Sequence, residues 1–198
     1  MDIAAATQTY LLYVVMPLWL AAGMADWLCH RASHIETTSG WKESAIHLLM
    51  LVEVGTPILL ALLFEINALI LALSIVAFVA HEATAHWDLR YALPRRRVGP
   101  AEQHVHNYLG ALPFMALSFI FVMHYPQLFA LLGIGTEPAR FGLELKHEPL
   151  PAAYVGGLLA AVVLFELAPY VEEWWRGWTQ KPRGPVVRRP ATASGDTP

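Results

Sequence analysis

Cysteine is almost absent from this chain of 198 residues, in which Cys29 is the only one. A single cysteine excludes an intrachain disulfide framework, and it excludes zinc and iron–sulfur sites that need several thiolates. Free cysteine is among the most buried residue types, so we interpret Cys29 as a small buried side chain. Its neighbour is His30, and a thiolate ligand at this position is the alternative.

Charge is also scarce, since charged residues make up 15% of the chain and hydrophobic residues 56%. This balance favours an integral membrane protein over a soluble domain. The net charge of −3 and the lack of a basic, aromatic-interleaved segment argue against a nucleic-acid partner. The N-terminus has no basic region and no small-residue cleavage site before its first apolar run. We therefore expect that run to be a retained helix rather than a signal peptide.

Long apolar runs are the main structural signal. They cover residues 10–28, 46–64, 68–80, 109–123 and 152–167, and the third is expected to continue to His86. Each run has roughly the length that a helix needs to cross a ~30 Å hydrocarbon core. The predicted fold is an all-α integral membrane bundle of about five hydrophobic helices, within a membrane domain over residues 1–179. Residues 180–198, rich in proline and small polar residues, are predicted to be a disordered basic tail.

The short connection at residues 65–67 predicts a tight antiparallel hairpin between the second and third helices. Such a hairpin returns the chain to the membrane face that it left, so residues 26–47 and 81–108 should lie on the same face. Eleven lysines and arginines fall on that side, and only Arg140 and Lys146 on the other. The positive-inside bias then places both segments and the C-terminus in the cytoplasm, with the N-terminus outside. The expected location is a bacterial inner membrane.

Seven of the nine histidines lie in these two segments, interleaved with carboxylates. Asp26, His30 and His34 are spaced by four, so they share one face of a helix. Two imidazoles at this spacing can reach one metal ion, and a carboxylate one turn earlier can bind the metal or orient a histidine. Glu43 and His47 repeat the spacing. This pattern predicts a metal site, and a structural hydrogen-bond network is the alternative.

The second segment supplies the remaining candidates. Glu82 and His86 are four apart, whereas His104 and His106 are two apart, as in an extended segment or on divergent faces of a helix start. The predicted metal ligands are Asp26, His30, His34, His47, His81, His86, His104 and His106. The predicted catalytic carboxylates are Glu43, Glu82 and Glu102. Arg31 and Arg90 are candidates for binding a substrate headgroup, and Arg95, Arg96 and Arg97 for contacting lipid phosphate.

The donor set narrows the choice of metal. Imidazole with carboxylate and without cysteine suits iron, zinc or manganese. The candidates exceed what one tetrahedral zinc needs, which favours two metal ions. The string HEATAH, from His81 to His86, has one residue too many to match the HExxH pattern of zinc proteases.

Several motifs resemble those of the fatty acid hydroxylase / sterol desaturase superfamily. DWLCHRASH, from Asp26 to His34, resembles its first histidine box, and Trp41-Lys42 leading to His47 resembles the approach to its second. The stretch His81–His86 resembles its histidine-bearing segment after the transmembrane hairpin, and PAEQHVH from Pro100 resembles its last box. The resemblance covers residues 10–125. The chain departs from the family in having one histidine in the second box and HxH, rather than HxxHH, in the third.

The resemblance implies two non-haem iron ions that activate O2 to hydroxylate or desaturate a lipid or other hydrophobic substrate. It also implies a ferredoxin- or cytochrome-like electron donor. Two other functions remain open on the residues alone. One is a membrane zinc hydrolase, in which a metal-bound water attacks the substrate and a carboxylate acts as the base. The other is a non-enzymatic metal carrier or assembly subunit.

Overall fold

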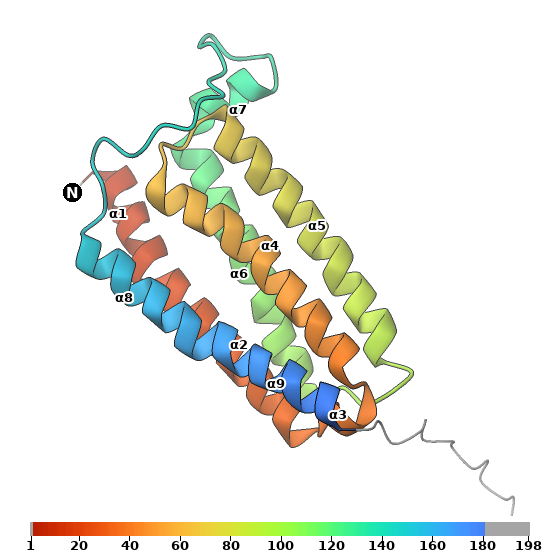
Figure 1. The fold of residues 1–198 in the computed structure, drawn as a ribbon. Helices are drawn as coiled ribbons and strands as arrows, with labels where there is room; N and C mark the ends of the chain where they lie inside the picture. The colour runs from red at the N-terminus through yellow and green to blue at the C-terminus, as the bar shows by residue number, and fades with distance from the viewer. Residues whose placement is uncertain (1, 181–198) are drawn as a thin grey trace, which may run out of the picture.

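Long helices run side by side along the molecule in the computed structural model, which describes residues 2–180 (Figure 1). The first comprises α1 (Ile3–Tyr10), a π-helical turn η1 (Leu11–Val15) and α2 (Met16–Ala32). The next helices are α3 (Ile35–Thr38), α4 (Trp41–Leu63), α5 (Ala68–Ala92), α6 (Pro100–Met123) and α7 (Tyr125–Leu131). The last comprises α8 (Ala152–Val162), a π-helical turn η2 (Val163–Leu167) and α9 (Ala168–Thr179). The described residues contain no β-sheet, and the all-α prediction is confirmed.

Five helical segments are long and apolar enough to cross a membrane: Ile3–Ala32, Trp41–Leu63, Ala68–Ala92, Pro100–Met123 and Ala152–Thr179. Their outward faces carry exposed apolar side chains, such as Val76 at 66% and Val122 at 73% exposure, while many buried residues are polar. This reversal of the soluble pattern fits an integral membrane protein, because lipid solvates apolar side chains and not polar ones. Residues 181–198 of the predicted tail lie outside the described part of the chain.

The α4–α5 hairpin is as tight as the sequence predicts. Asn67 begins α5, and its side-chain oxygen accepts hydrogen bonds from the backbone N–H groups of Leu69 and Ile70 at 3.0 and 3.3 Å. Such a cap satisfies donors that the first helical turn leaves free. The hairpin brings the two histidine-bearing segments to the same end of the bundle, beside α3 (Figure 1). That prediction is confirmed.

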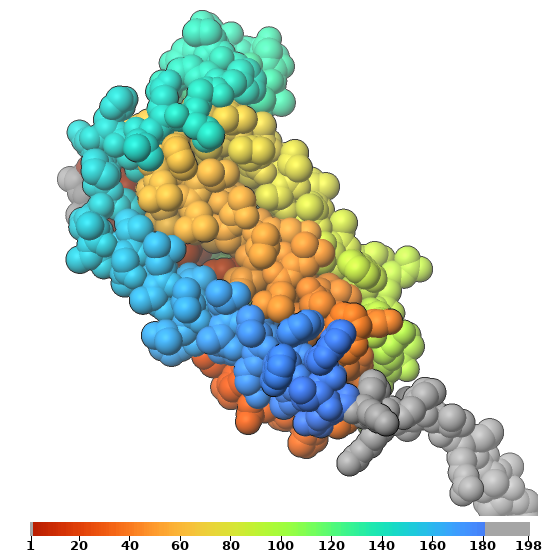
Figure 2. Space-filling view, viewed as in Figure 1, coloured from red at the N-terminus to blue at the C-terminus, as the bar shows by residue number. Residues whose placement is uncertain are grey.

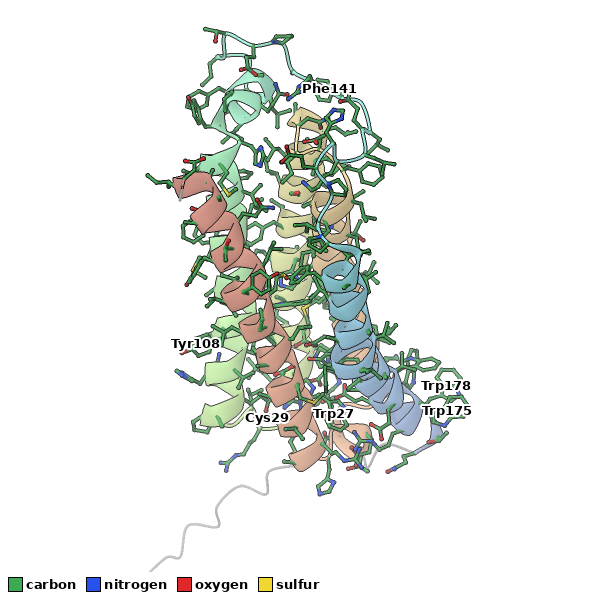
Figure 3. The ribbon with its side chains drawn as sticks, turned by 90° about the vertical axis from the view of Figure 1, so that its left-hand side faces the viewer. Trp27, Cys29, Tyr108, Phe141, Trp175 and Trp178 are labelled. Carbon is green, nitrogen blue, oxygen red and sulfur yellow. The ribbon has the colours of Figure 1, made fainter. Side chains whose placement is uncertain are left out.

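The helices extend beyond the apolar runs at this end. Helix α4 begins at Trp41, α5 continues to Ala92 and α6 begins at Pro100, so polar sequence forms their additional turns. These turns stay helical because their polar side chains meet one another inside the bundle. The segment from Tyr170 to Trp178, whose three tryptophans suit a membrane–water interface, consists of the last turns of the fifth helix. Trp175 and Trp178 project outward from it, as Figure 3 shows.

Helix α9 lies very close to the start of α4, and α8 and α9 run along the surface beside α4 (Figure 2). The close approach requires glycine at position 177. A Cβ atom there would lie 2.7 Å from the Trp41 nitrogen and 2.9 Å from its Cα. Backbone atoms cannot move aside as a flexible side chain can. The absence of a side chain at Gly177 therefore sets how near α9 comes to the bundle interior.

We expect Gly177→Ala to lower the free energy of unfolding by about 1–3 kcal/mol, the usual cost of overpacking a close contact. The measurement is the midpoint of thermal unfolding in detergent. Gly157→Ala in α8 is the matched control, because nothing lies within 4 Å of a Cβ at that position. The control should be neutral or slightly stabilising, since alanine favours helix. Equal midpoints for the two variants would contradict the close packing.

Candidate metal centre

Nine polar residues converge at the α3 end of the bundle, and we call them the polar cluster. Each comes from α2, α4, α5, α6, α9 or the α5–α6 loop, and all except His106 are buried. The members are Asp26, His30, Glu43, His47, Asp88, Arg96, Glu102, His106 and Glu173. Ionisable groups are rare in membrane helices because they are costly there, and they normally mark a functional site.

Glu173 joins two histidines. Its Oε2 lies 3.1 Å from Nδ1 of His30, and its Oε1 lies 3.3 Å from Nδ1 of His47. The two rings stack with their centroids 4.5 Å apart and their planes 14° apart. Because an ionised carboxylate can only accept hydrogen bonds, each neutral ring carries its proton on Nδ1. Both Nε2 atoms then present a lone pair, which is how a carboxylate orients metal-binding histidines.

The Nε2 atoms face carboxylates rather than donors. Nε2 of His30 lies 3.4 Å from both Asp26 Oδ2 and Glu102 Oε1, and Nε2 of His47 lies 3.3 Å from Asp88 Oδ1. Within residues 2–180 neither nitrogen has a hydrogen-bond partner, and nor do several carboxylate oxygens of the polar cluster. These oxygens include Asp26 Oδ1, Glu43 Oε2 and Asp88 Oδ1. Buried polar atoms without partners are uncommon in proteins and call for an explanation. A cation between the lone pairs would supply one.

The ligand atoms are close enough to share an ion. Those of Asp26, His30 and His106 lie within 4.8 Å of one another, as do those of His30, Glu43 and His47. All are imidazole nitrogens or carboxylate oxygens, a set that suits iron, zinc or manganese. The ligands come from separate helices whose ends are packed together, so the site is held by the bundle. These residues therefore fit a metal centre.

Arg96 is the basic residue buried among these acids. Its guanidinium makes two contacts to Glu43 Oε1, at 2.5 and 2.8 Å, and one to Glu102 Oε1 at 2.5 Å. Burial disfavours its charge, but the hydrogen bonds to Glu43 and the nearby Glu102 outweigh burial and raise the pKa of Arg96. Arg95 and Arg97 are exposed. The structure thus places only these two flanking arginines where lipid phosphate can reach them.

Several predicted site residues lie away from the polar cluster. The exposed ones are His34, His86, His104, Glu82, Arg31 and Arg90. His34 misses the face of His30 because α2 ends at Ala32 and His34 takes a left-handed backbone conformation, with φ of 53°. His86 lies two residues from the inward-facing Asp88, so it points to the opposite side of α5. Arg31 instead pairs with Glu172 at 3.1 Å.

His81 is buried but sits apart from the polar cluster. It faces Glu53, with 4.0 Å between His81 Nδ1 and a Glu53 carboxylate oxygen. The other Glu53 oxygen accepts a hydrogen bond from the Thr84 hydroxyl at 2.8 Å. Seven residues separate His81 from Asp88, which is roughly 10 Å along α5. The structure therefore makes His81, Glu53 and Thr84 a second, deeper polar group.

Two cluster members, Asp88 and Glu173, are not among the site residues predicted from the sequence, although helical spacing places each on a face with other polar residues. Asp88 lies seven residues after His81, with Thr84 between, on one face of α5. Glu173 likewise lies seven residues after Glu166, with Tyr170 between. The Tyr170 hydroxyl contacts the Gly23 carbonyl at 3.2 Å and Asp26 Oδ2 at 3.3 Å. The fifth helix therefore contacts the ligand candidate Asp26 through Tyr170 and contributes the carboxylate of Glu173.

No protein-family model, curated protein or solved structure matches this chain. The resemblance to the fatty acid hydroxylase / sterol desaturase superfamily stays a prediction.

We expect Arg96→Met to lower the free energy of unfolding by about 3 kcal/mol or more, because it leaves buried Glu43 and Glu102 without their cation. Arg97→Met is the matched control on the next residue, where the side chain is exposed and a change within about 0.5 kcal/mol is expected. Thermal unfolding of both variants in detergent checks the difference. Similar midpoints for the two variants would show that Arg96 does not stabilise the acids.

Proposed function

We propose that the polar cluster binds two iron ions and that the protein is a membrane oxidase. In this proposal it uses O2 to hydroxylate or desaturate a lipid or other hydrophobic substrate. The observation that carries the proposal is the pair of histidines held by Glu173, whose free Nε2 atoms face buried carboxylates. This arrangement supplies lone pairs at one place and leaves them without protein donors.

The charge of the polar cluster supports two divalent ions. Its five carboxylates are buried, and Arg96 is the buried arginine among them. With neutral histidines, four negative charges remain. Burying an ion without compensation costs several kcal/mol. Two divalent ions would balance the four charges, whereas a hydrogen-bond network alone would need protonated histidines or protonated acids.

The proposal gives each residue a role. Asp26, His30 and His106 would hold one ion with Glu102, and His47 would hold the other with Glu43 and Asp88. Glu173 orients both histidines, and Arg96 holds Glu43 and Glu102 in place. Helical bundles that bind two irons likewise use carboxylates and histidines from facing helices.

Iron would supply the O2 activation that amino-acid side chains cannot provide. The chain supplies a buried position for the ligands and an apolar exterior through which a hydrophobic substrate can approach from lipid. Arg90 is exposed at the same end, where it can bind an anionic headgroup, whereas Arg31 would first have to leave Glu172. We place this end in the cytoplasm of a bacterium, where a ferredoxin- or cytochrome-like donor would deliver electrons.

Elemental analysis of the purified protein in detergent should find about two iron ions per chain. His47→Ala should lose at least one, because it removes a buried ligand. His86→Ala is the matched control and should retain both, because its side chain is exposed. One zinc per chain would instead favour the hydrolase. No metal in protein produced with iron and zinc supplied would rule out the metal centre.

Glu173→Gln should weaken iron binding about 10–100-fold, the usual effect of losing a carboxylate that orients a metal-binding histidine. The amide donates from one atom, so it cannot accept a hydrogen bond from both rings. Glu172→Gln is the matched control on the preceding, partly exposed residue. Competition with an iron chelator measures the affinity of each variant. Equal affinities would remove Glu173 from the proposed site.

A further inference from the structure

A cavity of about 280 Å³ lies inside the bundle, apart from the polar cluster. It is lined mainly by η1, α4, α5 and α6, and its walls are mainly apolar, with Val15, Ile58, Phe78 and Leu117 among them. Its volume is close to the lower limit for small-molecule sites, so it accommodates one hydrocarbon chain rather than two. The apolar walls predict an apolar occupant.

The end of the cavity far from the polar cluster is basic. Lys146 and His124 both line it, and Lys146 is only partly exposed although its neighbour Leu145 is 69% exposed. The backbone positions Lys146: its N–H donates to the Leu63 carbonyl at 3.0 Å, and the next N–H donates to the Glu65 carboxylate at 2.8 Å. These bonds fix residues 145–147 to the end of α4 and hold the lysine at the mouth of the cavity.

No carboxylate forms an ion pair with Lys146 or His124 among residues 2–180. Glu65 is the nearby acid, and it is already bonded to the backbone of His147. Burial lowers the pKa of the Lys146 ammonium and of the His124 imidazole, and the attraction of Glu65 does not offset this effect of burial. An anionic group at the mouth would stabilise both charged forms.

We propose that this cavity binds a single-chain amphiphile with an anionic head. The head lies at Lys146 and His124, and the chain runs between α4 and α6 toward Glu53 at the opposite end of the cavity. Glu53 follows His47 by six residues, roughly 9 Å along α4, so the far end of the chain points toward the polar cluster. The proposal goes beyond the oxidase function, because the cavity needs no metal ion.

The test is competition against radiolabelled palmitate bound to the purified protein in maltoside micelles. Hexadecyl phosphate should compete as palmitate does, because both combine one chain with an anionic head. Hexadecanol and hexadecyltrimethylammonium should compete at least about tenfold more weakly, since neither supplies the charge. Equal competition by the cationic amphiphile would overturn the proposal. So would a co-purified two-chain phospholipid, found by native mass spectrometry, that palmitate cannot displace.

Variants assign the binding to this cavity. Lys146→Glu should weaken palmitate binding at least about tenfold, whereas Arg140→Glu, at the other basic residue of this end, should not. Ala116→Trp should abolish binding by filling the cavity, and Ala111→Trp, exposed on the same helix, should leave it intact. Unchanged binding in Lys146→Glu would overturn the proposal, and this loop substitution tests it without disturbing the packing.

Iron content measured on the same samples separates this proposal from the oxidase. Lys146→Glu should keep its iron while losing palmitate. Iron-loaded protein that binds no palmitate would overturn the cavity proposal alone. Metal-free protein that still binds palmitate would overturn the oxidase alone.

Discussion

The concentration of negative charge at one end of an apolar bundle constrains the rest of this structure. Five carboxylates are buried there with Arg96, while the outer surfaces of the same helices are apolar. Burying these charges costs free energy, so such a cluster is stable only where each charge has a partner of opposite charge or a hydrogen-bond partner. The close approach of α9 at Gly177 and the tight α4–α5 hairpin both help to form the cluster, because they bring polar helix turns into contact.

The fifth helix completes the site. Glu173 lies 143 residues after His30 in the chain and yet contacts both buried histidines. Tyr170, one turn earlier, contacts Asp26, and the space next to Gly23 is taken by the Glu166 carboxylate, which a Cβ there would strike. A helix that reads as an apolar span followed by an aromatic anchor thus contributes three inward polar groups. Its role in function would follow from those groups rather than from its anchoring.

The two ends of the molecule have opposite chemistry. One end gathers acids and imidazoles, and the other presents basic Lys146 and His124 to an apolar cavity. The cavity lies between them, with Glu53 at its inner end. Phe141 near one end and Trp175 and Trp178 near the other mark two aromatic levels along the bundle (Figure 3). Aromatic side chains favour membrane–water interfaces, so the chemistry of both ends lies near the interfaces.

The sequence by itself determined the class of fold, because several apolar runs of about the length of a membrane span permit little besides a helical membrane bundle. It also determined that the histidine-bearing segments meet, since a hairpin of three linking residues must return the chain. Only the tertiary structure decided which side chains face inward. His34 follows the end of a helix, and His86 is on the exposed side of α5, opposite Asp88. Sequence spacing alone could not exclude these two histidines from the site. Helical spacing puts Glu173 on the face of Glu166 and Tyr170, but its contacts with His30 and His47, like those of Arg96 with Glu43 and Glu102, join distant segments that local periodicity does not encode.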